Sequence, residues 1–106
     1  MSFFSNLFGK VRLPPGIDLG LRAEAEDLIK ELIEIGKKED FLSEHPGGLF
    51  NAQCHHMRAR AIGRRLDEIG GLELMQVARE RVRKKLKMNI ASHLDYAWAH
   101  IGQWMP

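Results

Sequence analysis

The chain has 106 residues and a formal net charge of +2, with 44% of its residues hydrophobic and 28% charged. This length and composition are typical of one globular domain and exclude a disordered protein. No apolar run approaches the roughly 20 residues that a membrane-spanning helix needs, and we expect no secretory signal because the first residues lack a basic leader. The single cysteine cannot form an internal disulfide. This favours a reducing compartment, and we expect a cytoplasmic protein.

Residues 1–17 are predicted to be an apolar extension ahead of a helical domain at residues 18–106. The large apolar side chains of the extension fall on one side of any short helix that it forms: Phe3, Phe4, Leu7 and Phe8. The Pro-Pro-Gly sequence at residues 14–16 predicts a connecting turn. We expect the extension to fold over the core or to clasp a second chain.

A first helix is predicted over residues 19–37. Asp18 is a suitable N-cap, and Gly36 lies where the helix would end. Acidic residues face away from an apolar stripe, as in a helix with one buried side. The stripe consists of Leu21, Ala25, Leu28, Leu32 and Ile35. The sequence HPGG at residues 45–48 then predicts a turn.

A second helix is predicted over residues 49–69, because Gly70 and Gly71 stop it. A third is predicted over residues 72–104, either continuous or kinked near Asn89. Strand signals are missing, since the sequence contains no threonine and no alternating apolar run. We therefore expect an all-α single domain of three to four helices, with antiparallel neighbours joined by short connections.

A thiol and three imidazoles are candidates for a metal site. On a helical wheel Cys54 and His55 face the apolar side of the second helix, and His93 and His100 fall on the apolar stripe of the third. Thiolate and neutral imidazole are ligands that zinc prefers, so one hypothesis is a site for zinc or another divalent metal. The alternative is that the histidines are hydrogen-bonded core residues and that the cysteine is a small buried hydrophobe.

Sequence spacing does not favour catalysis or a resident cofactor. The chain lacks the short Cys-x-x-Cys spacing of zinc sites, because it has one cysteine. Adjacent residues on a helix diverge by about 100°, so His55 is badly placed to activate Cys54 as a nucleophile. We expect no catalytic residue and no cofactor.

Arg58 and Arg65 lie between the two apolar seams of the second helix. A guanidinium group in this position has to pair with an acid or extend to water, because burying it alone is unfavourable. We expect buried ion pairs with acids of the first helix or with Asp95.

Charge is divided along the chain, with a net −5 over residues 18–44 and +6 over residues 45–87. Six of the bases crowd one stretch of the third helix, at Arg79, Arg81, Arg83, Lys84, Lys85 and Lys87. Clustered cations bind phosphates, so one hypothesis is that residues 78–87 bind nucleic acid or another anion. The alternative is a charged face that meets the acidic one within the monomer or across a subunit interface.

Trp98 and Trp104 provide large surfaces of the kind used at protein interfaces. Together with the apolar extension and the divided charge, they indicate a homodimer or another protein partner. The leading hypothesis is a non-enzymatic helical interaction or assembly module that uses the extension, the two tryptophans and the basic helix. The alternatives are nucleic-acid or anion binding and a small metal-binding protein.

Overall fold

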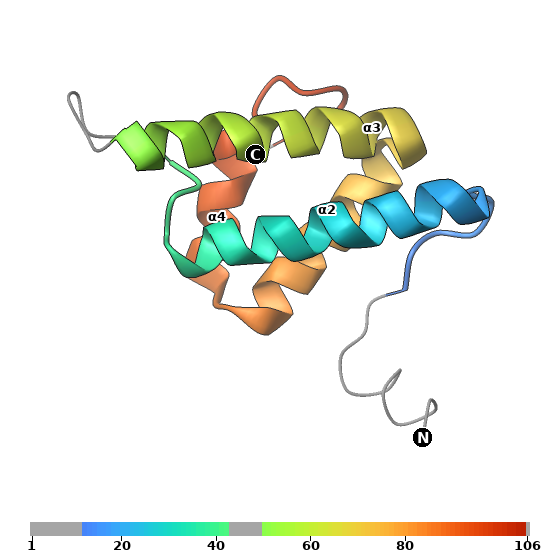
Figure 1. The fold of residues 1–106 in the computed structure, drawn as a ribbon, viewed down its shortest axis with the longest axis horizontal. Helices are drawn as coiled ribbons and strands as arrows, with labels where there is room; N and C mark the ends of the chain where they lie inside the picture. Colours follow the sequence, from blue (N-terminus) through green and yellow to red (C-terminus); the bar gives the residue numbers. More distant parts are fainter. Residues whose placement is uncertain (1–11, 43–49, 106) are drawn as a thin grey trace.

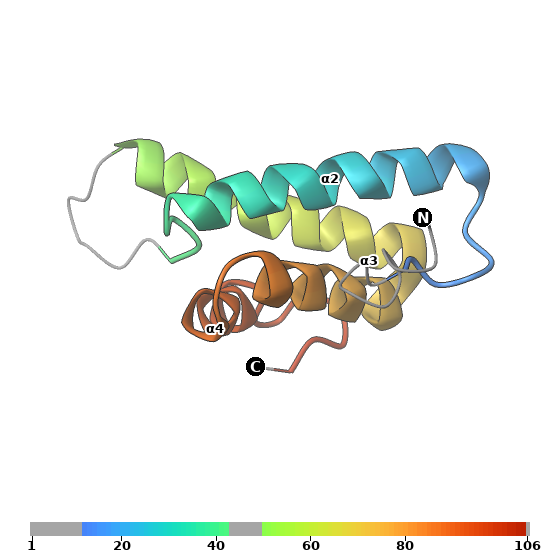
Figure 2. The same ribbon diagram turned by 90° about the horizontal axis from the view of Figure 1, so that it is seen from below.

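The computed structural model describes residues 12–42 and 50–105. Over these residues the chain is helical and contains no strand, with α2 at Leu19–Lys37, α3 at Phe50–Lys85 and α4 at Met88–Ala97. Helix α2 lies along the first part of α3, and the last part of α3 packs with α4 on the other side of the core (Figures 1 and 2). This arrangement confirms the prediction of an all-α single domain.

Helix α2 has the predicted bounds. Asp18 is its N-cap residue, although its side chain makes no capping hydrogen bond to a described group. The helix ends because Glu39 adopts a left-handed conformation, with φ of 57°. The N–H of Glu39 then donates to the carbonyl of Gly36 over 2.9 Å and closes the last turn.

Helix α3 combines the second predicted helix with the first part of the third. The two segments meet at Gly71, whose φ of 67° and ψ of −160° are not helical. Glycine adopts this conformation readily because it lacks a Cβ atom. The predicted stop at Gly70 and Gly71 is therefore a sharp bend, and no loop separates the two segments.

The third predicted helix, over residues 72–104, is too long. The alternative with a kink near Asn89 is partly right, because the helix is interrupted close to that residue. Helix α3 ends at Lys85, and α4 begins at Met88, close to the kink expected near Asn89. Helix α4 ends at Ala97, and turns follow it.

Turns replace the predicted end of that helix without changing which side chains are buried. The N–H of Ile101 donates to Trp98, and the N–H of Trp104 donates to Ile101. Each bond spans three residues, so apolar side chains at this spacing still face the core. The periodicity that predicted a helix to residue 104 is thus produced by consecutive turns.

The core fills the space between α2, both parts of α3 and α4. Its fully buried large side chains are Ile29, Leu32, Phe41, Ile62, Leu66, Leu74, Met75, Val82, Leu94 and Trp98. Leu13 is also buried at one end of this core. Among the described residues, no helix is long and apolar enough to cross a membrane.

Two of the residues proposed as an interface, Trp98 and Trp104, are buried. Trp98 is fully buried and Trp104 is 8% exposed, so both tryptophans belong to the core and not to an interaction surface. Their rings meet edge to face, with centroids 5.0 Å apart. The four apolar residues of the extension, Phe3, Phe4, Leu7 and Phe8, lie outside the described residues.

Candidate functional site

The cysteine and histidines proposed as metal ligands do not come together. Cys54 is exposed and does not point into the packed centre as expected. His100 is exposed in the turn after α4, and His93 is half-buried. Within the part of the chain that the structure describes, no three His, Cys, Asp or Glu side chains form a group that could hold a metal ion. The helical wheel was wrong at Cys54, because this side chain in the second turn of α3 is exposed, whereas the next residue, His55, is half-buried.

His55 and His56 bind the segment that follows α2. The Nδ1 atom of His55 lies 2.6 Å from Oδ2 of Asp40, and Nδ1 of His56 lies 2.6 Å from the carbonyl oxygen of Phe41. Because a carbonyl oxygen only accepts, His56 donates this hydrogen bond. The side chain of Phe41 is fully buried. The two histidines therefore fasten the end of α2 to α3, which is a structural role.

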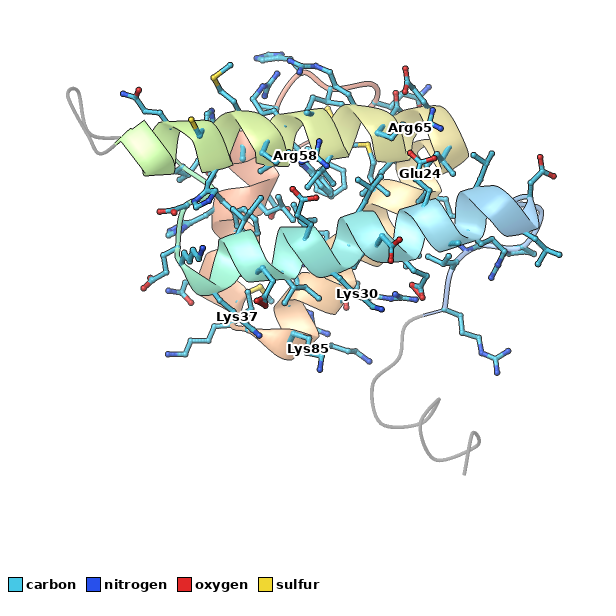
Figure 3. The ribbon with its side chains drawn as sticks, viewed as in Figure 1. Glu24, Lys30, Lys37, Arg58, Arg65 and Lys85 are labelled. Atoms are coloured by element: carbon cyan, nitrogen blue, oxygen red, sulfur yellow. The ribbon has the colours of Figure 1, made fainter. Side chains whose placement is uncertain are left out.

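Arg58 and Arg65 form a ladder of ion pairs between α3 and α2 (Figure 3). Arg58 donates two hydrogen bonds to Glu31, at 2.5 and 2.9 Å. Arg65 donates two to Glu24, at 2.6 and 2.9 Å. The earlier acid of α2, Glu24, pairs with the later arginine of α3, Arg65. The two segments therefore run in opposite directions at this contact.

The ladder differs from the expected buried pairs. The side chains of Arg58 and Arg65 are 47% and 42% exposed, so they lie at the rim of the helix contact. The hydrogen bonds from Arg58 lower the pKa of Glu31, and those from Arg65 lower the pKa of Glu24. Partial desolvation of each carboxylate acts in the opposite direction.

The pH dependence of stability tests this ladder. The pKa of Glu31 is lower in the folded chain than its ordinary value of 4.5, so the unfolded chain takes up the proton first on acidification. The stabilisation is therefore present above the unfolded pKa and is lost as the pH falls through the folded pKa. The free energy of unfolding of the wild-type protein should decrease between neutral pH and roughly pH 3. We expect this decrease to be smaller in the Glu31→Gln variant, by less than about 0.5 kcal/mol, because the pair is largely exposed.

Urea denaturation at both pH values measures this effect. The matched control is Glu73→Gln, since Glu73 is an exposed acid of α3 with no ion-pair partner among the described residues. Equal pH dependence in the two variants would show that the Glu31 pair contributes nothing.

The arginines of the predicted basic helix are neutralised within the molecule. Arg79 donates to both carboxylate oxygens of Asp95, at 3.1 and 3.0 Å. Arg81 pairs with Glu26 of α2, and Arg83 pairs with the acid three residues before it. The side chains of Arg79 and Arg81 are only 22% and 16% exposed. Arg79 and Arg81 thus fasten α3 to α4 and α2 and are poorly placed for an external partner, whereas Arg83 is paired within α3.

The lysines behave differently from the arginines. Lys84, Lys85 and Lys87 are exposed, and none of them forms an ion pair with a residue in the described ranges. Lys85 lies on the same side of the molecule as Lys30 and Lys37 of α2 (Figure 3). Together with Lys87, these residues form what we call the lysine face: Lys30, Lys37, Lys85 and Lys87.

A pocket of about 340 Å³ opens on the lysine face, where the end of α2 meets the break between α3 and α4. Its lining consists of Gly36, Lys37, Glu39, Lys85, Leu86, Lys87, Asn89 and Ile90. The lining, as far as the structure describes it, thus carries three lysines and one glutamate. Lys37 also forms a 2.8 Å ion pair with Glu34, but both side chains are more than half exposed. Such a pair is weak, so Lys37 can exchange this partner for a ligand.

Gly36 brings the sides of this pocket close together. A Cβ atom at this position would lie 2.6 Å from Cδ1 of Leu86 and 2.9 Å from Cζ of Phe41. Glycine therefore allows the end of α2 to approach the break after α3, and this contact places Lys37 and Lys85 around one cavity. The spacing of Lys30 and Lys37 on one helix face was visible in the sequence, but their convergence with Lys85 was not.

A second pocket, of about 410 Å³, has a different charge. Arg79, Glu80, Asp95 and Trp104 are among its lining residues. Its arginine is already hydrogen-bonded to both acids. An anionic ligand would have to displace these carboxylates, so this pocket is a poor anion site.

Neither a family model, nor a curated protein, nor a solved structure matches the chain. The functional argument therefore depends on the geometry and charge of its own residues.

Proposed function

We propose that the protein is a non-enzymatic helical binding module that contacts the phosphate backbone of nucleic acid through the lysine face. The observation that carries this proposal is the division between the two kinds of base. Arg79, Arg81 and Arg83 are held in ion pairs within the molecule, whereas the lysines remain exposed. An ammonium group is a compact point charge without a fixed hydrogen-bonding plane, which suits phosphate contacts that do not depend on sequence.

The number of lysines sets the expected strength of binding. A protein that neutralises Z phosphates of duplex DNA releases counterions, and its log affinity falls with log salt at a slope of about −0.9Z. Four lysines predict a slope of about −3 to −4. The lysine face is small, so we expect weak binding that is detected at low ionic strength.

Fluorescence anisotropy with a duplex of random sequence, about 20 base pairs long, tests the proposal between about 50 and 200 mM salt. We expect Lys30→Gln to weaken binding and to reduce the steepness of the salt dependence by about one unit. The control is Arg64→Gln on the first part of α3, which removes one exposed positive charge outside the lysine face. Absence of duplex binding by the wild-type protein at low salt, or an equal effect of the two substitutions, would overturn the proposal.

A homodimer or other protein partner is a second proposal. The divided charge no longer supports a subunit interface, because acids of α2 pair with Arg58, Arg65 and Arg81 of the same chain. Large apolar side chains that remain exposed provide what support there is: Leu19, Met57, Met88, Tyr96 and Met105. The solution mass of the sample used for anisotropy, measured by light scattering, tests this second proposal. A cytoplasmic location remains part of the proposal and is compatible with an exposed free cysteine.

A further inference from the structure

We infer that the pocket on the lysine face binds a nucleoside 5′-monophosphate group, either as a free nucleotide or as the phosphorylated 5′ end of a strand. This inference rests on the proposed function, because it assigns the hollow part of the same face to one terminal phosphate. The three lysines come from separate segments of the chain, the end of α2, the end of α3 and the break before α4, and they meet at one cavity.

The charge of the pocket fits a phosphate monoester better than a backbone diester. Lys37, Lys85 and Lys87 supply three positive charges to the lining, and Glu39 supplies one negative charge. A phosphate monoester carries a charge of about −1.5 to −2 at neutral pH, whereas each phosphodiester of a strand carries about −1. The net positive charge of the lining therefore matches the monoester.

The volume of the pocket and its remaining lining residues fit the rest of a nucleotide. A volume of about 340 Å³ is within the range of small-ligand pockets. Leu86 and Ile90 line the pocket together with the polar side chain of Asn89. Apolar side chains can pack against a sugar or base, and the Asn89 amide can donate to an oxygen of the ligand. Glu39 can accept from a sugar hydroxyl, but it repels phosphate.

The lining contains both lysines and a glutamate, so neutralising a lysine and neutralising the glutamate should change nucleotide affinity in opposite directions. We expect Lys85→Gln to weaken binding of adenosine 5′-monophosphate about five- to tenfold, since it removes a charge-assisted contact at a partly exposed site. We expect Glu39→Gln to strengthen binding about two- to fivefold, because it removes repulsion. Isothermal titration calorimetry at low salt measures both changes.

The matched control is Lys84→Gln. Lys84 is exposed and adjacent to Lys85, but it is not among the described residues that line the pocket. Lys84→Gln changes the net charge as Lys85→Gln does, so it should leave nucleotide affinity within about twofold. Equal weakening by both substitutions, or no effect of Glu39→Gln, would overturn the inference. The three altered side chains are exposed, and unchanged thermal unfolding verifies that the variants fold.

A second arm separates the two sources of the ligand and separates this inference from the proposed function. One single strand is compared with and without a 5′ phosphate, and the free monophosphate is used as a competitor. Stronger binding of the phosphorylated strand, reversed by the competitor, supports a strand end, whereas binding of the free monophosphate alone supports a nucleotide ligand. Salt-dependent duplex binding with no effect of the 5′ phosphate and no nucleotide binding would overturn the inference and leave the proposed function standing. Nucleotide binding without duplex binding would overturn the proposed function and leave this inference standing.

Discussion

Replacing Trp98 with alanine is expected to lower the free energy of unfolding by about 3–5 kcal/mol, which is the usual effect of truncating a large buried aromatic side chain. Trp98 is fully buried, and its ring meets that of Trp104 at an interplanar angle of 86°. Its Nε1–H donates to the carbonyl oxygen of Ala59 over 2.9 Å, which connects the turn after α4 to the first part of α3. The substitution removes this packing and leaves a buried acceptor without its donor. Urea denaturation measures the change.

The control for Trp98→Ala is Tyr96→Ala. Tyr96 lies two positions earlier in the chain, and its side chain is 66% exposed. We expect this substitution to change the free energy of unfolding by no more than about 0.5 kcal/mol. If the two variants differ by less than about 1 kcal/mol, Trp98 does not anchor the core, and the interface role predicted from the sequence is restored.

The first helix could be predicted to the residue because its signals act locally. Asp18 precedes it, an apolar stripe runs along it, and Gly36 lies in its last turn. Gly71 also gave a correct boundary, since its positive φ is a property of one residue. The end of the third predicted helix was wrong because turns with three-residue hydrogen bonds preserve helical spacing, so the positions of Ile101 and Trp104 did not distinguish the two conformations.

The candidate site could be predicted only in part, because it depends on which segments meet. A helical wheel gives the side of α3 on which Cys54 lies, but it cannot show whether another segment covers that side, and Cys54 is exposed. The crowding of bases at residues 79–87 was visible, but the sequence did not separate paired arginines from exposed lysines. That separation depends on Asp95 and Glu26, which reach Arg79 and Arg81 from other helices.

The pocket itself had no sequence signal. Lys37 and Lys85 are far apart along the chain and line one cavity because α3 bends at Gly71 and ends beside the last turn of α2. The close contact of Gly36 with Leu86 then fixes this approach. Neither contact follows from periodicity, since both join segments that are distant in the sequence.

Substituting Gly63 with alanine is expected to lower the free energy of unfolding by about 1–3 kcal/mol, the usual effect of adding a methyl group to a filled core. Gly63 is a buried residue of α3, and a Cβ atom there would lie 2.5 Å from Nε1 and 2.7 Å from Cδ1 of Trp98. The indole ring cannot easily move away, since it is bonded to Ala59 and packed against Trp104. The higher helix propensity of alanine, worth about 1 kcal/mol, offsets only part of this overpacking. Urea denaturation again measures the change.

Gly20→Ala is the matched control, because the same change in α2 has the opposite expected sign. No described atom lies within 4 Å of a Cβ at Gly20, so this variant should gain up to about 1 kcal/mol from helix propensity alone. The double variant Gly63→Ala with Trp98→Ala then identifies the cause of the loss at Gly63. If the methyl group acts against the indole ring, the double variant should be more stable than the sum of the two single effects by about 1 kcal/mol or more. Additive effects would instead mean that the backbone of α3, and not Trp98, requires glycine at this position.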